Sequence, residues 1–164
     1  AEFGLGKDKT IQVLKAFIKL VPDYQIVAIA GKNKKMKEDF ENLVNSCDAS
    51  NRVRILGFTD KVPELMHIAC LVVTKPGGLT TTETLACGLP MVIINPIPGQ
   101  EEENAEFLVS NGVAVWIKKE DNLENVISSL FDSDTLEKMK ENVKSLSKKN
   151  STEQICKISL ESLN

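Results

Sequence analysis

The sequence contains few of the histidine and cysteine residues that hold zinc ions. Its one histidine is His67, and its four cysteines form no C-x-x-C pair. A structural zinc site draws on four such ligands at short spacings, so this pattern argues against zinc. We expect Cys70 and Cys87, which lie in an apolar run and in a predicted helix, to be buried free thiols in a reducing cytoplasm. His67 itself is expected on a helix surface or at the edge of a core.

Long apolar runs and a strong excess of one charge are also missing. No run approaches the ~20 residues that a spanning helix needs, and no signal peptide opens the sequence, so any membrane contact should be peripheral. A formal net charge of −3 excludes a general electrostatic footprint for nucleic acid. A mildly basic first half favours either an anionic ligand or lipid surface or, more simply, solvated helix faces.

The composition is that of a globular protein. With 42% hydrophobic and 26% charged residues, the chain lies outside the regime of disordered sequences. Its 164 residues correspond to one domain that is long enough to bury a single conventional core.

Short apolar segments alternate with amphipathic ones along the whole chain. The alternation predicts an α/β fold with a Rossmann-like parallel sheet, helices on both faces and right-handed crossovers. The strands are expected at residues 24–30, 53–56, 71–74, 91–94 and 113–117, and the helices at 7–22, 34–46, 62–69, 80–87, 101–110 and after the last strand.

Ligands of such open sheets bind beyond the carboxyl ends of the strands. Gly77-Gly78 lies between a predicted strand and a helix, where backbone N–H groups are accessible and favour a phosphate, although a plain tight turn is an equal alternative. Glu83 lies farther along that helix. Its carboxylate could accept hydrogen bonds from ribose hydroxyls or simply stabilise the positive end of the helix dipole.

A polar cluster opens the next helix. Gln100, Glu101 and Asn104 provide the paired donors and acceptors that suit sugar hydroxyls. The alternative is an ordinary acidic first turn, which is the interpretation we give to Glu102 and Glu103.

These and other short motifs follow one another through the chain in a fixed order. They are Gly57-Phe58, Thr74-Lys75-Pro76-Gly77-Gly78-Leu79-Thr80, Glu83, Gly88-Leu89-Pro90 and Pro96-Ile97-Pro98-Gly99-Gln100-Glu101 with Asn104-Ala105. In this order they resemble glycosyltransferase family 28, which includes processive diacylglycerol glucosyltransferase, monogalactosyldiacylglycerol synthase and MurG. The likeness covers nearly the whole chain and is closer to the diacylglycerol enzymes than to MurG.

The resemblance implies a role for each motif. The family has two Rossmann-like domains in a GT-B arrangement, and the C-terminal one, here residues 1–164, holds the UDP-sugar. Gly4-Leu5-Gly6 matches the glycine-rich turn that opens this domain, so its first strand and the N-terminal acceptor domain are expected to be missing. The implied UDP-sugar-binding residues are Phe58 at the uracil, Gly77, Gly78, Leu79 and Thr80 at the diphosphate, Glu83 at the ribose, and Gln100, Glu101 and Asn104 at the donor sugar.

The implied reaction is an inverting, metal-independent transfer of a hexose from UDP-glucose or UDP-galactose to diacylglycerol. The family's catalytic base and lipid groove belong to the missing domain, so no catalytic residue is expected here, and no cofactor or metal. The full enzyme is expected in the cytoplasm, peripheral to the inner face of the cell membrane. The alternatives are a MurG-like transferase with another lipid acceptor and a stand-alone nucleotide-binding module.

One motif points elsewhere. Asp132-Ser133-Asp134 has the D-x-D form with which other glycosyltransferase folds hold a metal on UDP, but apolar residues at helical spacing follow it. We interpret it as a helix N-cap. Trp116, in a predicted strand, is interpreted as a packing residue.

Overall fold

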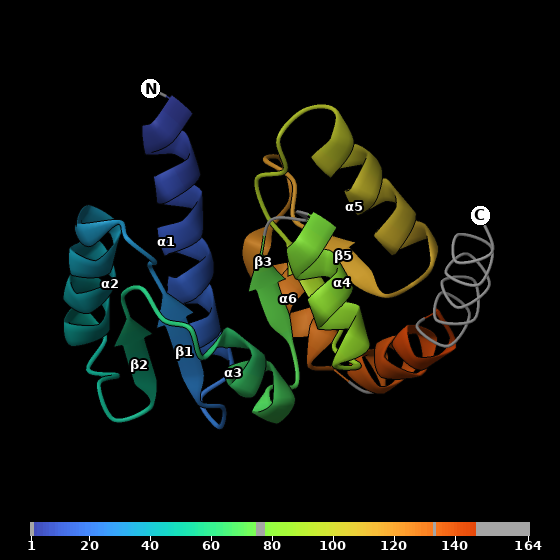
Figure 1. The fold of residues 1–164 in the computed structure, drawn as a ribbon. Coiled ribbons are helices and arrows are strands. Elements are labelled where there is room, and N and C mark those ends of the chain that lie inside the picture. Colours follow the sequence, from blue (N-terminus) through green and yellow to red (C-terminus); the bar gives the residue numbers. More distant parts are fainter. Residues whose placement is uncertain (1, 75–77, 133, 147–164) are drawn as a thin grey trace. The chain divides into compact units, whose positions relative to one another are not determined.

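A computed structural model describes residues 2–74, 78–132 and 134–146 of the chain (Figure 1). Strands and helices alternate as predicted, and the α/β fold class is confirmed. The elements are α1 (Glu2–Leu20), β1 (Ile26–Ile29), α2 (Lys34–Ser46), β2 (Val53–Leu56), α3 (Val62–Ile68), β3 (Val72–Thr74), α4 (Gly78–Ala86), β4 (Met91–Ile93), α5 (Gln100–Ser110), β5 (Ala114–Trp116) and α6 (Leu123–Leu130), followed by helical residues 135–146.

The described residues form two compact units. Unit 1 comprises the chain up to Pro63 together with residues 118–132, and unit 2 comprises residues 64–117 with 134–146. Each unit has its own parallel sheet, of β1-β2 in unit 1 and of β3-β4-β5 in unit 2. The core is therefore divided between two units, whereas chain length had suggested a single one.

In unit 1, α1 and α2 cover apolar residues of a two-stranded parallel sheet. The register runs from Ile26 opposite Val53 to Ile29 opposite Leu56. The buried side chains of this cluster are Leu14, Ile18, Ala28, Ala30, Phe40, Val44, Ala49 and Val53.

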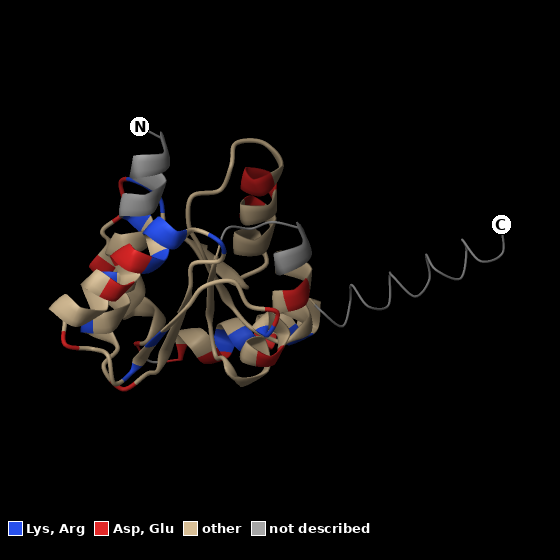
Figure 2. Ribbon diagram, turned by 60° about the vertical axis from the view of Figure 1, so that its left-hand side comes forward, with Lys and Arg blue, Asp and Glu red and all other residues tan. Residues whose placement is uncertain are grey.

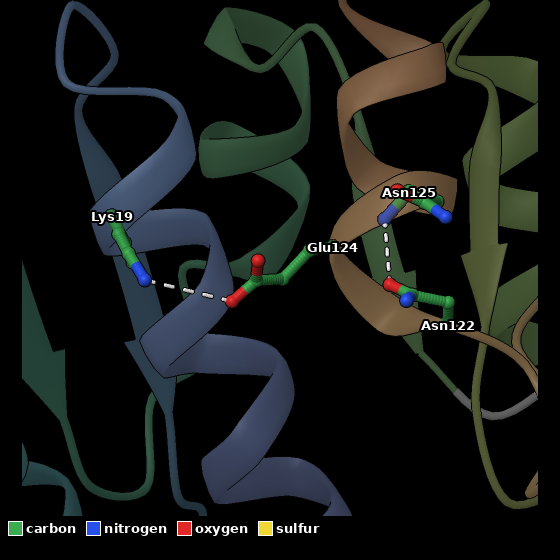
Figure 3. A network of polar contacts seen from close by, with 4 residues as sticks. All are labelled: Lys19, Asn122, Glu124 and Asn125. Carbon is green, nitrogen blue, oxygen red and sulfur yellow. Dashed lines mark hydrogen bonds and ion pairs between the residues drawn. The ribbon is translucent and has the colours of Figure 1, made fainter.

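Helix α6 packs against α1 within the same unit and is fixed at its start by a cap. The side chain of Asn122 accepts a hydrogen bond from the Asn125 N–H at 3.1 Å, which satisfies one of the first N–H groups of α6 (Figure 3). Lys19 of α1 forms an ion pair with Glu124 at 3.6 Å, and both side chains are largely exposed (Figure 3). An exposed pair of this kind contributes about 0–1 kcal/mol, so the buried apolar residues of α6 account for most of the contact's stability.

The C-terminal end of α1 is closed by a residue from the β2 side of the unit. The guanidinium of Arg52 donates to the carbonyl of Val21 at 3.4 Å and to the carbonyl of Ile18. Carbonyl groups at the end of a helix have no intrahelical partner, so a charged donor there is stabilising.

The start of α1 differs from the prediction. Gly4-Leu5-Gly6 was expected to form a glycine-rich turn, but α1 begins at Glu2 and includes these residues. Helical spacing of apolar residues continues from Ile11, and a glycine inside a helix costs only about 1 kcal/mol relative to alanine. The expected turn is therefore wrong for this structure.

In unit 2, β4 is the central strand, and its residues Met91, Val92 and Ile93 are completely buried. Helix α5 contributes Ala105 and Leu108 to the same cluster. Residues 135–146 add Val143 and Leu146, and Trp116 packs against the cluster as predicted. The near-continuous apolar sequence of β4 thus reflects burial on both faces.

The cysteines are free thiols as expected, but they are less buried than the sequence suggested. Cys47, Cys70 and Cys87 are free thiols, but each is half-buried where full burial was expected for the last two; Cys156 lies outside the described residues. Among the described residues, no helix has the length and apolar character needed to cross a membrane.

Candidate functional site

Two helices of unit 2 begin at the same edge of its sheet. Strands β3 and β4 are parallel neighbours, α4 follows β3, and α5 follows β4. Because the carboxyl ends of parallel strands meet at one edge, both helix N-termini lie along that edge. This is the position at which ligands of open α/β sheets bind.

The predicted phosphate residues form the first turn of α4. The helix begins at Gly78, two residues earlier than expected from sequence, and so includes Gly78, Leu79 and Thr80. The first four N–H groups of an α-helix have no intrahelical acceptor and carry the positive end of the helix dipole. Gly77 lies outside the described residues.

Glu83 is half-buried in the middle of the same helix. Its backbone carbonyl accepts the hydrogen bond from the Cys87 N–H that closes the end of α4. Its neighbours Thr84 and Leu85 are buried, so Glu83 lies at the border between the core and the surface of α4.

A threonine in the first half of α4 was missed by the sequence predictions. The hydroxyl of Thr81 is buried and has no hydrogen-bond partner in the structure. Leaving a buried hydroxyl unpaired costs about 1–3 kcal/mol, so the site has a position where a polar ligand atom would be stabilising. The run Thr80-Thr81-Thr82, which is separated from the glycines only by Leu79, was the signal in the sequence.

At the start of α5, one predicted sugar-binding residue already has a partner. The Glu101 carboxylate accepts a hydrogen bond from the Ile97 N–H at 3.0 Å and thereby closes the loop before the helix. A carboxylate has two oxygens and several acceptor sites, so this bond does not exhaust its capacity. Gln100 is exposed and Asn104 is half-buried on the same helix.

The first turn of α5 is strongly acidic. Glu101, Glu102 and Glu103 follow one another there, and Figure 2 shows acidic residues in red at the start of this helix. Carboxylates at a helix N-terminus are stabilised by the dipole, which supports the interpretation of Glu102 and Glu103 as helix-stabilising residues.

Phe58 belongs to unit 1, in the loop after β2. Its side chain is 71% exposed. The ammonium nitrogen of Lys32, which follows β1, lies over the Phe58 ring at 5.2 Å from the ring centroid. Sequence reasoning missed Lys32, although Gly31-Lys32-Asn33 directly after a predicted strand marks it as a residue of the same sheet edge.

Asp134 of the D-x-D segment directly precedes a helix, and Ser133 lies outside the described residues. Residues 135–146 are helical, and the Asp134 carbonyl accepts a hydrogen bond from the Lys138 N–H at 3.0 Å. That is the bond expected of an N-cap carbonyl. Within the described ranges, no group of three or more His, Cys, Asp or Glu side chains is placed to hold a metal ion. His67 is exposed on α3, one of the two positions expected for it.

A family model and the curated relatives both identify glycosyltransferases as the proteins to which this chain is similar. The model of the family described as Glycosyl transferases group 1 matches residues 5–146. Processive diacylglycerol beta-glucosyltransferase of Bacillus subtilis (strain 168) is 41% identical over 132 residues, which are 80% of this chain and 34% of that protein. The protein of the same name from Bacillus licheniformis is 38% identical over 151 residues, 92% of this chain and 39% of that protein. The chain thus spans about a third to two fifths of the length of these relatives.

Solved structures share the fold at lower identity. WaaG, a glycosyltransferase involved in lipopolysaccharide biosynthesis, matches 87% of this chain and 39% of its own with a TM-score of 0.67 and 20% identity. Anabaena Alr3699/HepE in complex with UDP-glucose matches 96% of this chain and 46% of its own with a TM-score of 0.66 and 20% identity. The matched part of both structures is therefore a domain of the same fold as this chain.

Proposed function

The chain belongs to the group 1 glycosyl transferases, and on that premise we propose that it binds the UDP-sugar in a transferase that moves glucose to diacylglycerol. The curated relatives named processive diacylglycerol beta-glucosyltransferase support this substrate pair. A structural neighbour of the same fold was solved with UDP-glucose, which supports the nucleotide sugar.

The observation that carries the proposal is the common edge at which α4 and α5 begin. The first N–H groups of α4, at Gly78, Leu79 and Thr80, donate to the diphosphate together with the N–H of Gly77. Glu83 accepts hydrogen bonds from the ribose, and the Thr81 hydroxyl gives the ligand a further polar partner.

The remaining contacts belong to the two ends of the ligand. Gln100, Glu101 and Asn104 bind hydroxyl groups of the sugar, with the bond from Ile97 to Glu101 holding the loop in place. The family resemblance alone assigns Phe58, a residue of unit 1, to the uracil. We propose that these N–H donors take the place of a metal ion, since they would stabilise the charge that develops on the departing diphosphate.

The rest of the reaction is assigned to parts of the enzyme beyond these residues. We propose that the catalytic base and the diacylglycerol groove lie in the acceptor domain of the full enzyme. That enzyme acts at the cytoplasmic face of the cell membrane as a peripheral protein, because its acceptor is a membrane lipid.

Titration calorimetry tests the proposal directly. The chain is titrated with UDP, UDP-glucose, UDP-galactose and UDP-N-acetylglucosamine, with and without EDTA. We expect UDP and UDP-glucose to bind, UDP-glucose to bind more tightly than UDP-galactose, and EDTA to change neither affinity. Absence of UDP binding would refute the proposed function. A preference for UDP-N-acetylglucosamine would indicate a MurG-like transferase with another lipid acceptor. A strict magnesium requirement would indicate that Asp132 and Asp134 hold a metal ion.

A further inference from the structure

The sheet of unit 1 has one open edge, along strand β1. This strand pairs with β2 on one side, and within the described parts of the chain no strand pairs with its other side. The N–H groups of Ile26 and Ala30 donate to carbonyl groups on the β2 side, each at 2.9 Å. Backbone groups of a parallel strand alternate in direction, so the N–H and C=O groups of Val27 and Ile29 point to the open side.

Strand β1 has the sequence of a central strand. The run Ile26-Val27-Ala28-Ile29 contains no charged residue, proline or glycine, and such runs are typical of parallel strands that are buried on both faces. Edge strands of natural sheets usually carry charged residues or proline, which prevent further pairing. In β2, the residue opposite Val27 is the exposed Arg54. Val27 and Ile29 are nevertheless each 40% exposed, so β1 lies in an edge position with a sequence suited to the interior of a sheet.

The helices of unit 1 indicate which strand would complete this sheet. Helices α1 and α2 pack on the same face of it, and their buried side chains in the common cluster are Leu14, Ile18, Phe40 and Val44. Helix α2 connects β1 to β2, and connections between parallel strands are right-handed in nearly all cases. Successive connections of the same hand over the same face step across the sheet in the same direction. A strand that leads into α1 would therefore lie beside β1, on the side opposite β2.

We propose that the open edge of β1 binds a parallel β-strand from the segment that precedes α1 in the full enzyme. The strand forms hydrogen bonds with the backbone of Val27 and Ile29 and makes β1 a central strand. The curated relatives have chain from which it can come, since this chain spans 34% and 39% of their lengths. The stability of unit 1 then depends on that segment. The proposal does not depend on the ligand of the proposed function.

Amide hydrogen exchange, measured by NMR on the 164-residue chain, tests whether the edge is open. We expect the N–H groups of Val27 and Ile29 to exchange at least about tenfold faster than those of Ile26 and Ala30, which donate to the β2 side. Equal protection of all four groups would overturn the proposal. Exchange that slows as the protein concentration rises would identify a second copy of the chain as the occupant, and the proposal would again be wrong.

An extended chain tests the identity of the occupant. The residues that precede the α1 equivalent in the Bacillus subtilis relative, up to about ten as in a long strand, are joined to Ala1. The same residues in scrambled order are the matched control. We expect the native order to slow exchange at Val27 and Ile29 at least about tenfold and to raise the urea midpoint, and the scrambled order to change neither. Equal effects of the two extensions, or no effect of either, would overturn the proposal.

A proline variant distinguishes strand pairing from general stabilisation. Val27→Pro removes an N–H group that points away from β2, and proline is tolerated in a strand at such a position. The variant therefore has little effect on the urea midpoint of the unextended chain but removes most of the gain from the extension. Val27→Thr, which keeps the N–H group and a β-branched side chain, retains that gain. A full gain in Val27→Pro would contradict pairing at this edge.

The comparison of the two extensions is decisive even if Val27→Pro does not fold, because it uses the wild-type sequence of β1. UDP binding enters none of these measurements. A failure of the strand proposal therefore leaves the proposed function unaffected, and a chain that binds no UDP can still show the expected exchange pattern.

Discussion

At the residue scale, carboxylates at the edge of unit 2 illustrate how one side chain can support both a fold and a ligand. Glu101 accepts a hydrogen bond from the Ile97 N–H, so its presence is already explained by the loop that it closes. Glu83 is half-buried in the middle of α4, beyond the first turn in which the helix dipole acts, so its replacement would also alter packing at the border of the core. A loss of UDP affinity in a variant could therefore reflect either a role in the fold or a role in ligand binding. Comparing two ligands that differ in one group separates these roles.

The prediction for Glu83 uses the ribose hydroxyls as the probe. If its carboxylate accepts hydrogen bonds from them, Glu83→Ala weakens UDP binding by about 1.5–3 kcal/mol, or roughly ten- to a hundredfold. The wild type prefers UDP to 2′,3′-dideoxy-UDP, and the variant loses most of that preference. Calorimetry with both nucleotides measures it.

The structural alternative gives a different result in the same experiment. Loss of a carboxylate that serves only the fold lowers the free energy of unfolding and does not alter discrimination between the two nucleotides. An unchanged preference in the alanine variant would remove Glu83 from the site.

At the element scale, the ends of α4 and α5 are built in the same way but differ in their surroundings. A glycine with positive φ follows each helix, Gly88 at 75° and Gly112 at 70°. A Cβ built on Gly88 would meet nothing within 4 Å, whereas one on Gly112 would lie 2.6 Å from Nδ2 of Asn142. That nitrogen donates to the Gly112 carbonyl at 3.0 Å and so joins the helical segment 135–146 to the end of α5.

This pair of glycines gives a prediction with an internal control. Gly88→Ala destabilises the protein by about 1 kcal/mol, the cost of a left-handed conformation for an L-residue. Gly112→Ala has the same backbone cost and also displaces Asn142, so we expect a loss of about 2–3 kcal/mol. Urea unfolding of both variants measures the difference. Equal losses would show that Asn142 moves aside at no cost.

The same scale shows what local sequence can and cannot predict. Helix 34–46 and strand 53–56 were predicted with the bounds that the structure has. The helix begins after Asn33, a capping residue, and β2 ends before Gly57, so both boundaries are encoded by adjacent residues. The start of α4 was placed two residues late, because Gly78 has a low helix propensity that its context overrides.

Features that depend on pairing between distant segments were not predictable. Periodicity identified every strand, but not that β1 and β2 form one sheet and β3, β4 and β5 another. Lys32 contacts Phe58 only because β1 and β2 pair in register, and Glu101 contacts Ile97 only because of the loop's conformation. The residue types of the candidate site were therefore available from sequence, whereas their hydrogen bonds and ring contacts were not.

At the scale of the whole molecule, donor binding and catalysis are separable properties. The described residues supply two helix N-termini at one sheet edge, which is enough for a nucleotide diphosphate. The relatives are two and a half to three times as long as the part that this chain matches, since it spans 34% and 39% of their lengths. Under the proposed function, the acceptor groove and the base belong to that additional length.

The last prediction follows from this division. The purified 164-residue chain binds UDP in the calorimeter but forms no glucosyldiacylglycerol when it is incubated with radiolabelled UDP-glucose and vesicles that contain diacylglycerol. Binding of the donor without a base leaves the acceptor hydroxyl protonated and unpositioned, and each of these deficits alone costs orders of magnitude in rate. The full-length Bacillus subtilis relative, incubated in parallel, is the positive control for the lipid product. Product formation by the chain at a rate comparable with that control would show that a base and an acceptor site lie within these residues, and the assignment of catalysis to another domain would then be wrong.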